Sequence, residues 1–319
     1  MTLANNHCLD FGAAGLGDTR AHLESAGIGV FGAGEDLVAA RRPLIRDLKG
    51  LRIGLVAACH ASTKPGAMAG PEDPGVAPLE TAVLVADIEA LRPQVDHVIA
   101  VLHWGLEYSH YPTPEQVDLA HAAVEAGASA VIGHHSHSLQ GIEQYRGAII
   151  AYSLANLTDA PVDWQGPTRH YSCEITDVDR ESVLLKLRLT RDAVALVETL
   201  PLWLDDRGAP SAASGARAEK IRADLAAYSA KITEGGLADY WRETVVGSRV
   251  SGPLMAWWRD GTLWDKLKGF RLSQLVTAWI LLRTWLRLRF SRSESKWELF
   301  NSRNDTRPMP SAERRQGDG

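Results

Sequence analysis

The chain has 319 residues, which is room for one large domain with an appendage or for two modest domains. Hydrophobic residues make up 45% and charged residues 23%, as is usual for globular proteins. The formal net charge of -5 gives no overall electrostatic reason to expect nucleic acid as a partner. Cys8, Cys59 and Cys173 lie far apart without a CxxC spacing, which argues against a disulfide framework and against a zinc ribbon.

No targeting or membrane-spanning segment is visible in the sequence. The first residues lack the basic stretch and following apolar run of a signal peptide. The longest apolar run, at 275–282, is ended by Arg283 and is too short to cross a membrane. By default we therefore expect a cytoplasmic protein.

The first 200 residues alternate between helical and strand patterns. Apolar residues at helical spacing predict helices, and short apolar runs predict buried strands. In chain order, the pattern predicts a helix at 13–26, strands at 28–31 and 51–59, a helix at 79–92, a strand at 97–103, a helix at 114–126, and strands at 128–133, 147–154 and 182–190. Strands alternating with helices indicate an α/β layered fold with a largely buried sheet.

The composition changes after this region. Residues 205–216 are rich in Gly, Pro and Ser and predict a linker, and 217–232 predict a helix. The chain then becomes rich in tryptophan, and later in arginine and other polar residues. We therefore divide it into a domain at 1–233, a Trp-rich basic helical appendage at 234–300 and a disordered tail at 301–319.

Polar side chains follow several predicted strands. His103 ends one strand, His135 and His137 follow the next, and Asn156 follows a third. Because sites in layered α/β folds assemble from loops at strand ends, we expect these groups to meet. His134 is expected to lie outside the site, since the neighbouring His135 and His137 could hold the site without it.

The His-x-His pair at His135 and His137 is the central candidate for metal binding. A turn after a strand can aim both imidazoles inward, and His103 is a natural third ligand. Asn6 and His7 add an amide oxygen and an imidazole from the start of the chain, unless that segment frays. Imidazoles with an amide suit zinc, iron or manganese as a divalent ion. Isolated histidines such as His97 and His121 are more often hydrogen-bonded than metal-bound.

Four short blocks, in order, resemble one protein family. They are ANNHCLDFG at 4–12, HWGLEY at 103–108, VIGHHSHSLQ at 131–140 and YSLAN at 152–156. The chain from residue 4 to about 233 resembles the CapA-like proteins of poly-γ-glutamate capsule synthesis, the PGA_cap domain of the calcineurin-like metallophosphoesterase superfamily. Two mild departures are Ser136, where the family has Pro, and Ala155, where it has Gly.

The resemblance implies a fold and a ligand set. The fold is a metallophosphoesterase-like four-layer α/β/β/α sandwich, with the metals above the strand ends. Asn6, His103 and His135 would ligate the second metal, and His137 the first. The substrate would be an anionic polymer or a compound of the phosphoester type.

The resemblance also implies the catalytic residues. His7 would act as general acid or stabilise the transition state, oriented by Asp10. Glu107 and Asn156 match positions in the family blocks, without an assigned role. On their own, Asp10 could simply cap a turn and Glu107 could be a surface ion-pair partner.

The family pattern begins upstream of the first block. Related proteins have a strand ending in Gly-Asp and a segment ending in Asn-Leu-Glu before the Asn-Asn-His block, which starts here at residue 5. The resemblance therefore implies a fold that is incomplete at its N-terminus and lacks a carboxylate ligand. Since a bridging carboxylate holds two cations about 3.5–4 Å apart, we expect one weakly held metal in its absence.

Three hypotheses for function follow. The first is a metal-dependent hydrolase that serves capsule synthesis at the cell envelope. The second is a non-catalytic, membrane-associated scaffold or export partner with a degenerate metal site. The third is a fragment that does not fold alone, because a missing strand leaves an open sheet edge.

Residues 262–292 form a basic segment within the appendage. No acidic residue lies between Asp265 and Glu294, whereas arginines and lysines alternate with apolar residues at nearly helical spacing. Such a helix can lie in a membrane interface. The alternative is that it packs onto the domain or onto a partner chain.

Overall fold

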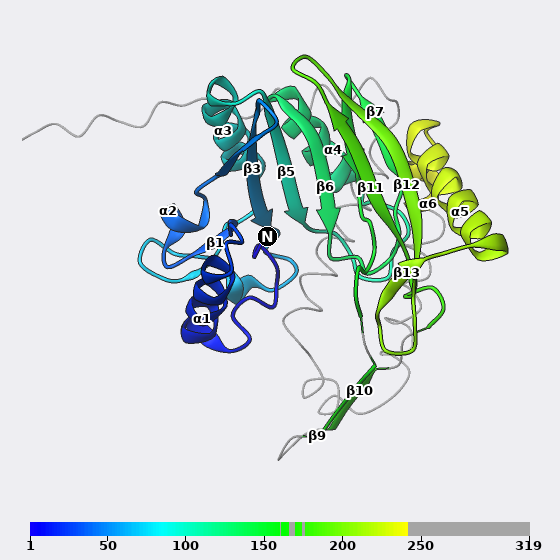
Figure 1. Ribbon diagram of the computed structural model, residues 1–319, viewed down its shortest axis with the longest axis horizontal. Coiled ribbons are helices and arrows are strands. Elements are labelled where there is room, and N and C mark those ends of the chain that lie inside the picture. Colours follow the sequence, from blue (N-terminus) through cyan, green and yellow to red (C-terminus); the bar gives the residue numbers. More distant parts are fainter. Residues whose placement is uncertain (160, 166–169, 174–175, 242–319) are drawn as a thin grey trace, which may run out of the picture.

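The fold is that of a computed structural model, which describes residues 1–159, 161–165, 170–173 and 176–241 (Figure 1). In this part of the chain we find no helix with the length and apolarity that a membrane crossing requires. The predicted basic segment at 262–292 and the predicted tail at 301–319 lie outside the described residues.

A six-stranded mixed sheet forms the centre of the fold, so the predicted α/β class is confirmed. The strand order is β2-β3-β5-β6-β8-β7, in which β3, β5, β6 and β8 are parallel and the edge strands β2 and β7 are antiparallel to their neighbours. The strands are β2 (Leu44–Leu48), β3 (Leu51–Cys59), β5 (His97–His103), β6 (Ala128–His134), β7 (Ile142–Tyr145) and β8 (Ala148–Ala151).

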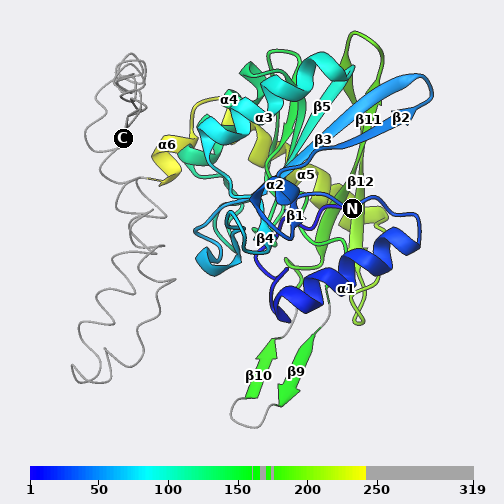
Figure 2. The ribbon, with the colours of Figure 1, turned by 90° about the vertical axis from the view of Figure 1, so that its left-hand side faces the viewer.

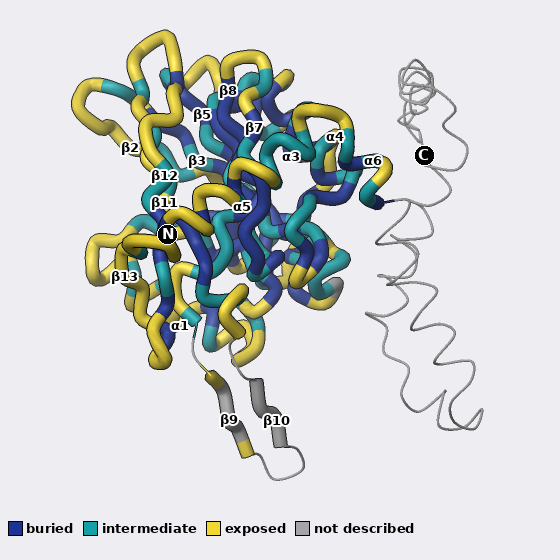
Figure 3. The backbone as a smooth tube through the Cα atoms, turned by 90° about the vertical axis from the view of Figure 1, so that its right-hand side faces the viewer, coloured by how far each residue is buried: buried dark blue, intermediate teal, exposed yellow. Residues whose placement is uncertain are grey.

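Two helices, α3 (Thr81–Leu91) and α4 (Pro114–Glu125), cover one face of this sheet (Figure 2). Alternate residues of β5, namely Val98, Ala100 and Leu102, pack into the core beneath these helices. Successive side chains of a strand point to opposite faces, so His103 belongs to the other face. Figure 3 shows that the most buried backbone runs along these central strands.

The N-terminal segment covers the opposite face of the sheet. Leu3 and Phe31 pack there against Ala57 and Cys59 of β3, and Thr2 forms a parallel bridge with Phe31. The elements of this region are α1 (Gly12–Ser25), β1 (Ala33–Gly34), α2 (Leu37–Ala40), a 3-10 turn at Pro65–Ala67 and β4 (Gly75–Val76); a second 3-10 turn, Arg92–Gln94, follows α3.

A second, antiparallel sheet follows in the chain, with β11 (Glu181–Leu189), β12 (Val194–Leu204) and β13 (Pro210–Ala212). Helix α5 (Gly215–Thr233) packs against β7 and β12. The hairpin of β9 (Val162–Gln165) and β10 (His170–Cys173) projects from the body of the fold (Figure 1). The described chain ends with α6 (Leu237–Tyr240) and Trp241.

The sequence predicted the inner strands of the central sheet and missed its edge strands β2 and β7, and it also missed β12, the middle strand of the second sheet. The strand predicted at 51–59 and the helix predicted at 114–126 are β3 and α4. The strand predicted at 28–31 is wrong, because this glycine-flanked segment pairs only through Phe31. The linker predicted at 205–216 contains β13, which pairs with β12 but has all three residues exposed, so no apolar pattern marks it.

Candidate functional site

The ends of three parallel strands lie in register at one edge of the central sheet. Cys59 of β3 pairs with His103 of β5, which pairs in turn with His134 of β6. The loops that follow therefore start side by side, and the backbone N–H of His60 donates to the His103 carbonyl at 2.9 Å. The sheet edge is thus the place where the predicted histidines meet.

Three imidazoles, one from the end of β5 and two from the loop after β6, lie together at this edge. The ring centroids of His103 and His135 are 4.7 Å apart, and those of His135 and His137 are 6.4 Å apart. Asn6, which is buried, places its Oδ1 2.9 Å from Nε2 of His103. We call Asn6, His103, His135 and His137 the imidazole cluster.

The start of the chain is packed rather than frayed. Leu3, Ala4 and Asn6 are each less than 10% exposed. The side chain of His7 is 66% exposed, and its Nδ1 lies 2.7 Å from Oδ2 of Asp10. The structure therefore places the predicted His7–Asp10 pair beside the cluster.

Unusual backbone conformations concentrate around the cluster. Of the six non-glycine residues with positive φ in the described chain, four lie in the loops after β5, β6 and β8: Tyr108, His135, His137 and Ala155. The φ values of 93° at His135 and 56° at His137 turn the chain out of the extended conformation of β6 directly after the strand ends, while the two rings stay within 6.4 Å of each other. Such strain persists where the surrounding structure holds it, and it is common at functional sites.

Gly133 permits a close approach beneath the cluster. The indole Nε1–H of Trp104 donates to the Tyr152 carbonyl at 3.1 Å and so joins the loops after β5 and β8. A Cβ on Gly133 would lie 1.9 Å from that carbonyl oxygen and 2.4 Å from the indole nitrogen. Only glycine fits at this position of the block 131–140.

Burial keeps two of the clustered imidazoles, those of His103 and His135, neutral. Burial, assisted by the neighbouring His135, lowers the pKa of His103 to about 2. Burial, assisted by His137, His7 and His60, lowers the pKa of His135 to about 4. The neutral imidazole is the form that binds a metal ion.

Asp10 stays ionised beside His7. Partial burial alone would raise the pKa of Asp10, but hydrogen bonds from Lys64 and His7 outweigh that effect and lower it. Lys64 also forms an ion pair with this carboxylate. An ionised Asp10 accepts a hydrogen bond from Nδ1 of His7 and so fixes the orientation of that ring.

Asn156 orients His137. Its Oδ1 accepts a hydrogen bond from Nδ1 of His137 at 2.9 Å, and its Nδ2 donates to Asp159 at 3.0 Å. This arrangement leaves Nε2 of His137 available as a ligand atom. Asn156 and Glu107 both matched family blocks without an assigned role. Glu107 lies exposed on the loop after β5.

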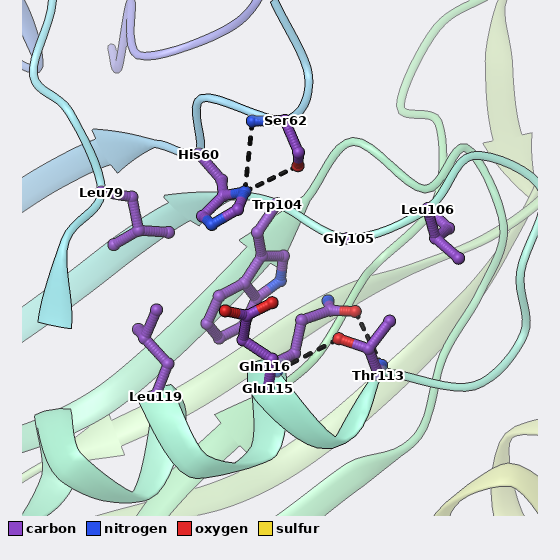
Figure 4. A pocket seen from close by; sticks show the side chains of 10 residues that line it. All are labelled: His60, Ser62, Leu79, Trp104, Gly105, Leu106, Thr113, Glu115, Gln116 and Leu119. Atoms are coloured by element: carbon purple, nitrogen blue, oxygen red, sulfur yellow. Dashed lines mark hydrogen bonds between the residues drawn. The ribbon is translucent and has the colours of Figure 1, made fainter. Parts of the chain in front are cut away.

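His60 belongs beside the cluster, and the sequence analysis missed it. Its Nδ1 lies 2.6 Å from the Ser62 hydroxyl, and its ring lines a small pocket with Trp104 and Glu115 (Figure 4). The pocket has a volume of about 20 Å³, enough for about one water. The available signal was its position directly after the strand predicted at 51–59.

The remaining histidines differ in their placement. His134 pairs with His103 at the strand ends, and burial lowers its pKa. His97 lies at the far end of β5, hydrogen-bonded to Ser129 and Thr190. His121 contacts both carboxylate oxygens of Glu143 at 3.0 Å.

The cluster fits a transition-metal cation in the chemistry of its donors. Ligands about 2.1 Å from one cation lie about 3 Å or slightly more from each other, and Asn6 Oδ1 and His103 Nε2 are 2.9 Å apart. Nδ1 of His135 is buried without a hydrogen-bond partner among the described residues. As placed, however, no three His, Cys, Asp or Glu side chains of the described chain form a group that could hold a metal.

Solved structures show only distant likeness. A putative 5'-nucleotidase from Staphylococcus aureus superposes with a TM-score of 0.43 and 13% identity, over 71% of this chain and 41% of that one. The NAD nucleotidase of Haemophilus influenzae gives 0.38 and 16%, over 71% and 40%. TM-scores this low do not establish a shared fold.

Sequence relatives are much more similar. A capsule biosynthesis protein CapA of Bacillus anthracis is 33% identical over 220 residues, which cover 68% of this chain and 50% of that protein. A probable polyglutamine synthesis accessory protein of Mycobacterium tuberculosis is 39% identical over 181 residues, covering 53% and 47%. The chain therefore spans about half the length of the curated relatives that it matches.

A family model described as "Bacterial capsule synthesis protein PGA_cap" matches residues 1–160. The match contains the whole imidazole cluster, His7, Asp10 and Asn156. It covers half of the 319 residues, and the chain belongs to the PGA_cap family of bacterial capsule synthesis proteins.

Proposed function

We propose that this chain acts in the synthesis of a poly-γ-glutamate capsule, and that its imidazole cluster is the cation site of a hydrolase. Membership of the PGA_cap family supports the capsule assignment. The observation that carries the site is the gathering of partly buried imidazoles beside the His7–Asp10 pair. The four-layer metallophosphoesterase sandwich is part of the same proposal.

The cluster would hold one divalent ion of zinc, iron or manganese. Asn6, His103 and His135 would supply an amide oxygen and two ring nitrogens, and His137 would add its Nε2, because Asn156 occupies Nδ1. Once bound, such an ion supplies Lewis acidity to an oxygen of the substrate. The end of β5, the loop after β6 and the N-terminal segment would hold these donors at the sheet edge before any ligand arrives.

His7 would supply a proton to the leaving group of a phosphoester or amide. Its Nδ1 is committed to Asp10, so Nε2 is the atom that can carry the transferable proton. Its side chain is 66% exposed, which allows a substrate to reach it. The ionised Asp10 would orient the ring through its hydrogen bond with Nδ1.

A non-catalytic role at the membrane is the second candidate. The observation that favours it is that no three His, Cys, Asp or Glu side chains of the described residues form a metal-holding group. In that case the chain would be a scaffold or export partner at the cell envelope. The basic segment 262–292 would then make the contact with the membrane.

Metal analysis of the full chain tests the cation site. The purified chain is equilibrated with Zn²⁺, Mn²⁺ or Fe²⁺ and then desalted. We expect it to retain about one ion, because the imidazole cluster provides one set of donors. His135→Ala should lose this ion, whereas His22→Ala, at an exposed position of α1, should retain it. A wild-type chain that retains none of these ions would refute the cation site.

Two further measurements separate the candidates. The hydrolase predicts cleavage of a generic phosphodiester or amide that is lost in His7→Ala and in His135→Ala but not in His22→Ala. Ion binding without any turnover would favour the scaffold. Deleting the gene in its source organism should reduce cell-bound poly-γ-glutamate, and unchanged polymer would contradict the capsule assignment.

A further inference from the structure

Tyr108 is an exposed aromatic residue beside the imidazole cluster. Its side chain belongs to the loop between β5 and α4, and the residue is 53% exposed. Its ring lies 5.8 Å from that of His137, centroid to centroid, and the two planes differ by only 21°. A partly exposed phenol ring therefore stacks on one imidazole of the candidate cation site.

The backbone holds Tyr108 in this position at a cost. Its φ is +58°, which is uncommon for an aromatic residue. Its N–H donates to the Ser136 carbonyl at 2.7 Å, so the loop is tied to the turn that carries His135 and His137. A strained conformation that directs a large side chain towards a site is evidence for a role there.

Neighbouring contacts hold the same loop rigidly. Gln140 donates from Nε2 to the Ser109 carbonyl at 2.8 Å, and Nδ1 of His110 lies 3.2 Å from the Leu139 carbonyl. Trp241, which is fully buried, donates from Nε1 to the Pro112 carbonyl at 2.7 Å. The ring of Tyr108 is thus placed by the loop around it as well as by its contact with His137.

The charge of the donors decides what a bound cation would attract. The donors of the imidazole cluster are an amide and imidazoles, which bind a metal as uncharged ligands, so a divalent ion there would keep its full charge. Asp10 reaches the cluster through His7 and is itself paired with Lys64, and Asp159 reaches it through Asn156. A ligand that carries an oxyanion would neutralise this charge.

We infer that Tyr108 recognises the ligand of this site, with its hydroxyl donating a hydrogen bond to a carboxylate or phosphate oxygen held next to the cation. Tyr108 would then be a specificity-determining residue, and the ligand class would be an oxyanion. This inference rests on the cation site of the proposed function. It adds a residue that touches the ligand and names the group of the ligand, an oxyanion, that this residue would contact.

The test compares two tyrosines in the full, Zn²⁺-loaded chain. Tyr108→Phe removes one hydroxyl and keeps the ring. Tyr145→Phe is the matched control, since Tyr145 also stacks on a histidine: its ring centroid lies 3.7 Å from that of His121. Tyr145 lies at the end of the β7–β8 pair that is opposite to the site. Calorimetric titration with inorganic phosphate and, separately, with a short γ-glutamate oligomer gives the affinities.

We expect Tyr108→Phe to weaken binding of the preferred oxyanion by roughly tenfold, as for a lost hydrogen bond to a charged group. Zn²⁺ affinity should stay unchanged in both variants, and Tyr145→Phe should bind like the wild type. The arm that binds more tightly identifies phosphate or carboxylate as the source. Equal affinity in Tyr108→Phe and wild type would overturn the inference, and so would a Zn²⁺-loaded wild type that binds neither probe. A wild type that takes up no cation would refute the proposed cation site, and the inference with it.

Discussion

Asn156 accepts a hydrogen bond from Nδ1 of His137 at 2.9 Å and thereby sets which ring nitrogen of that histidine faces the sheet edge. The amide is itself held by Asp159 at 3.0 Å, so its orientation is determined as well. The contacts from Asp159 through Asn156 to His137 therefore leave Nε2 of His137 as the ring nitrogen available to the imidazole cluster. This relationship gives a family-block residue a physical role.

Replacing Asn156 with Ala should weaken cation binding without removing a ligand. Outer partners of metal-bound histidines typically contribute about 10- to 100-fold in affinity, and we expect a loss in that range. Competition with a chromophoric chelator measures it. Gln94→Ala, which removes an exposed side-chain amide far from the site, is the control. Equal loss in both variants would contradict the positioning role.

The metal-free chain should lose stability in mild acid. His103 and His135 have folded-state pKa values of about 2 and about 4, below the usual 6.5. The unfolded chain therefore binds more protons below about pH 6.5, so the stability from these groups is complete above that pH and falls as the pH drops towards their folded pKa values. Each histidine can contribute up to about 1.4 kcal/mol per pH unit to the slope.

Urea unfolding with EDTA present, at pH 7.5 and at pH 5, measures this effect. His103→Gln should unfold with a smaller pH dependence than the wild type, because one of the two groups is gone. His22→Gln, at an exposed histidine, should keep the wild-type slope. A His103→Gln slope equal to that of the wild type would show that this imidazole is not buried as the structure has it.

The start of α4 should depend on its N-cap. Thr113 accepts from the Gln116 backbone N–H, and the Gln116 side chain accepts from the Thr113 backbone N–H, which completes a capping box. Thr113→Ala should cost about 1 kcal/mol in the free energy of unfolding. Ser214, the N-cap of α5, makes no side-chain cap hydrogen bond, so Ser214→Ala should change stability much less. Chemical denaturation compares the two, and equal costs would argue against the capping box.

Trp241 should anchor the loop that carries Tyr108. Its side chain is fully buried against Leu106, and its indole N–H satisfies the Pro112 carbonyl. Trp241→Phe leaves that carbonyl without its donor and should cost about 1–3 kcal/mol. Trp203→Phe, on the partly exposed face of β12, is the control. A wild-type melting temperature in Trp241→Phe would contradict the anchoring contact.

The central part of the fold was predictable because its signals are local. The apolar run 51–59 became β3 with the same bounds, and Thr113 with Pro114 marked the start of α4. The edge strands β2, β7 and β13 were not predicted, since only one of their residues is buried and no apolar pattern marks them. The first strand prediction, 28–31, failed because a short apolar run does not reveal whether a sheet neighbour exists.

The sequence by itself determined which side chains follow the parallel strands, and therefore that His103, His135 and His137 would meet at one sheet edge. Only the tertiary structure decided that His60 joins them, that Asn156 orients His137 and that the ring of Tyr108 stands beside it. Strand periodicity reports which face a residue takes. The hydrogen bonds and positive φ angles that aim a side chain depend on partners distant in the sequence, so they arise only when the loops pack together.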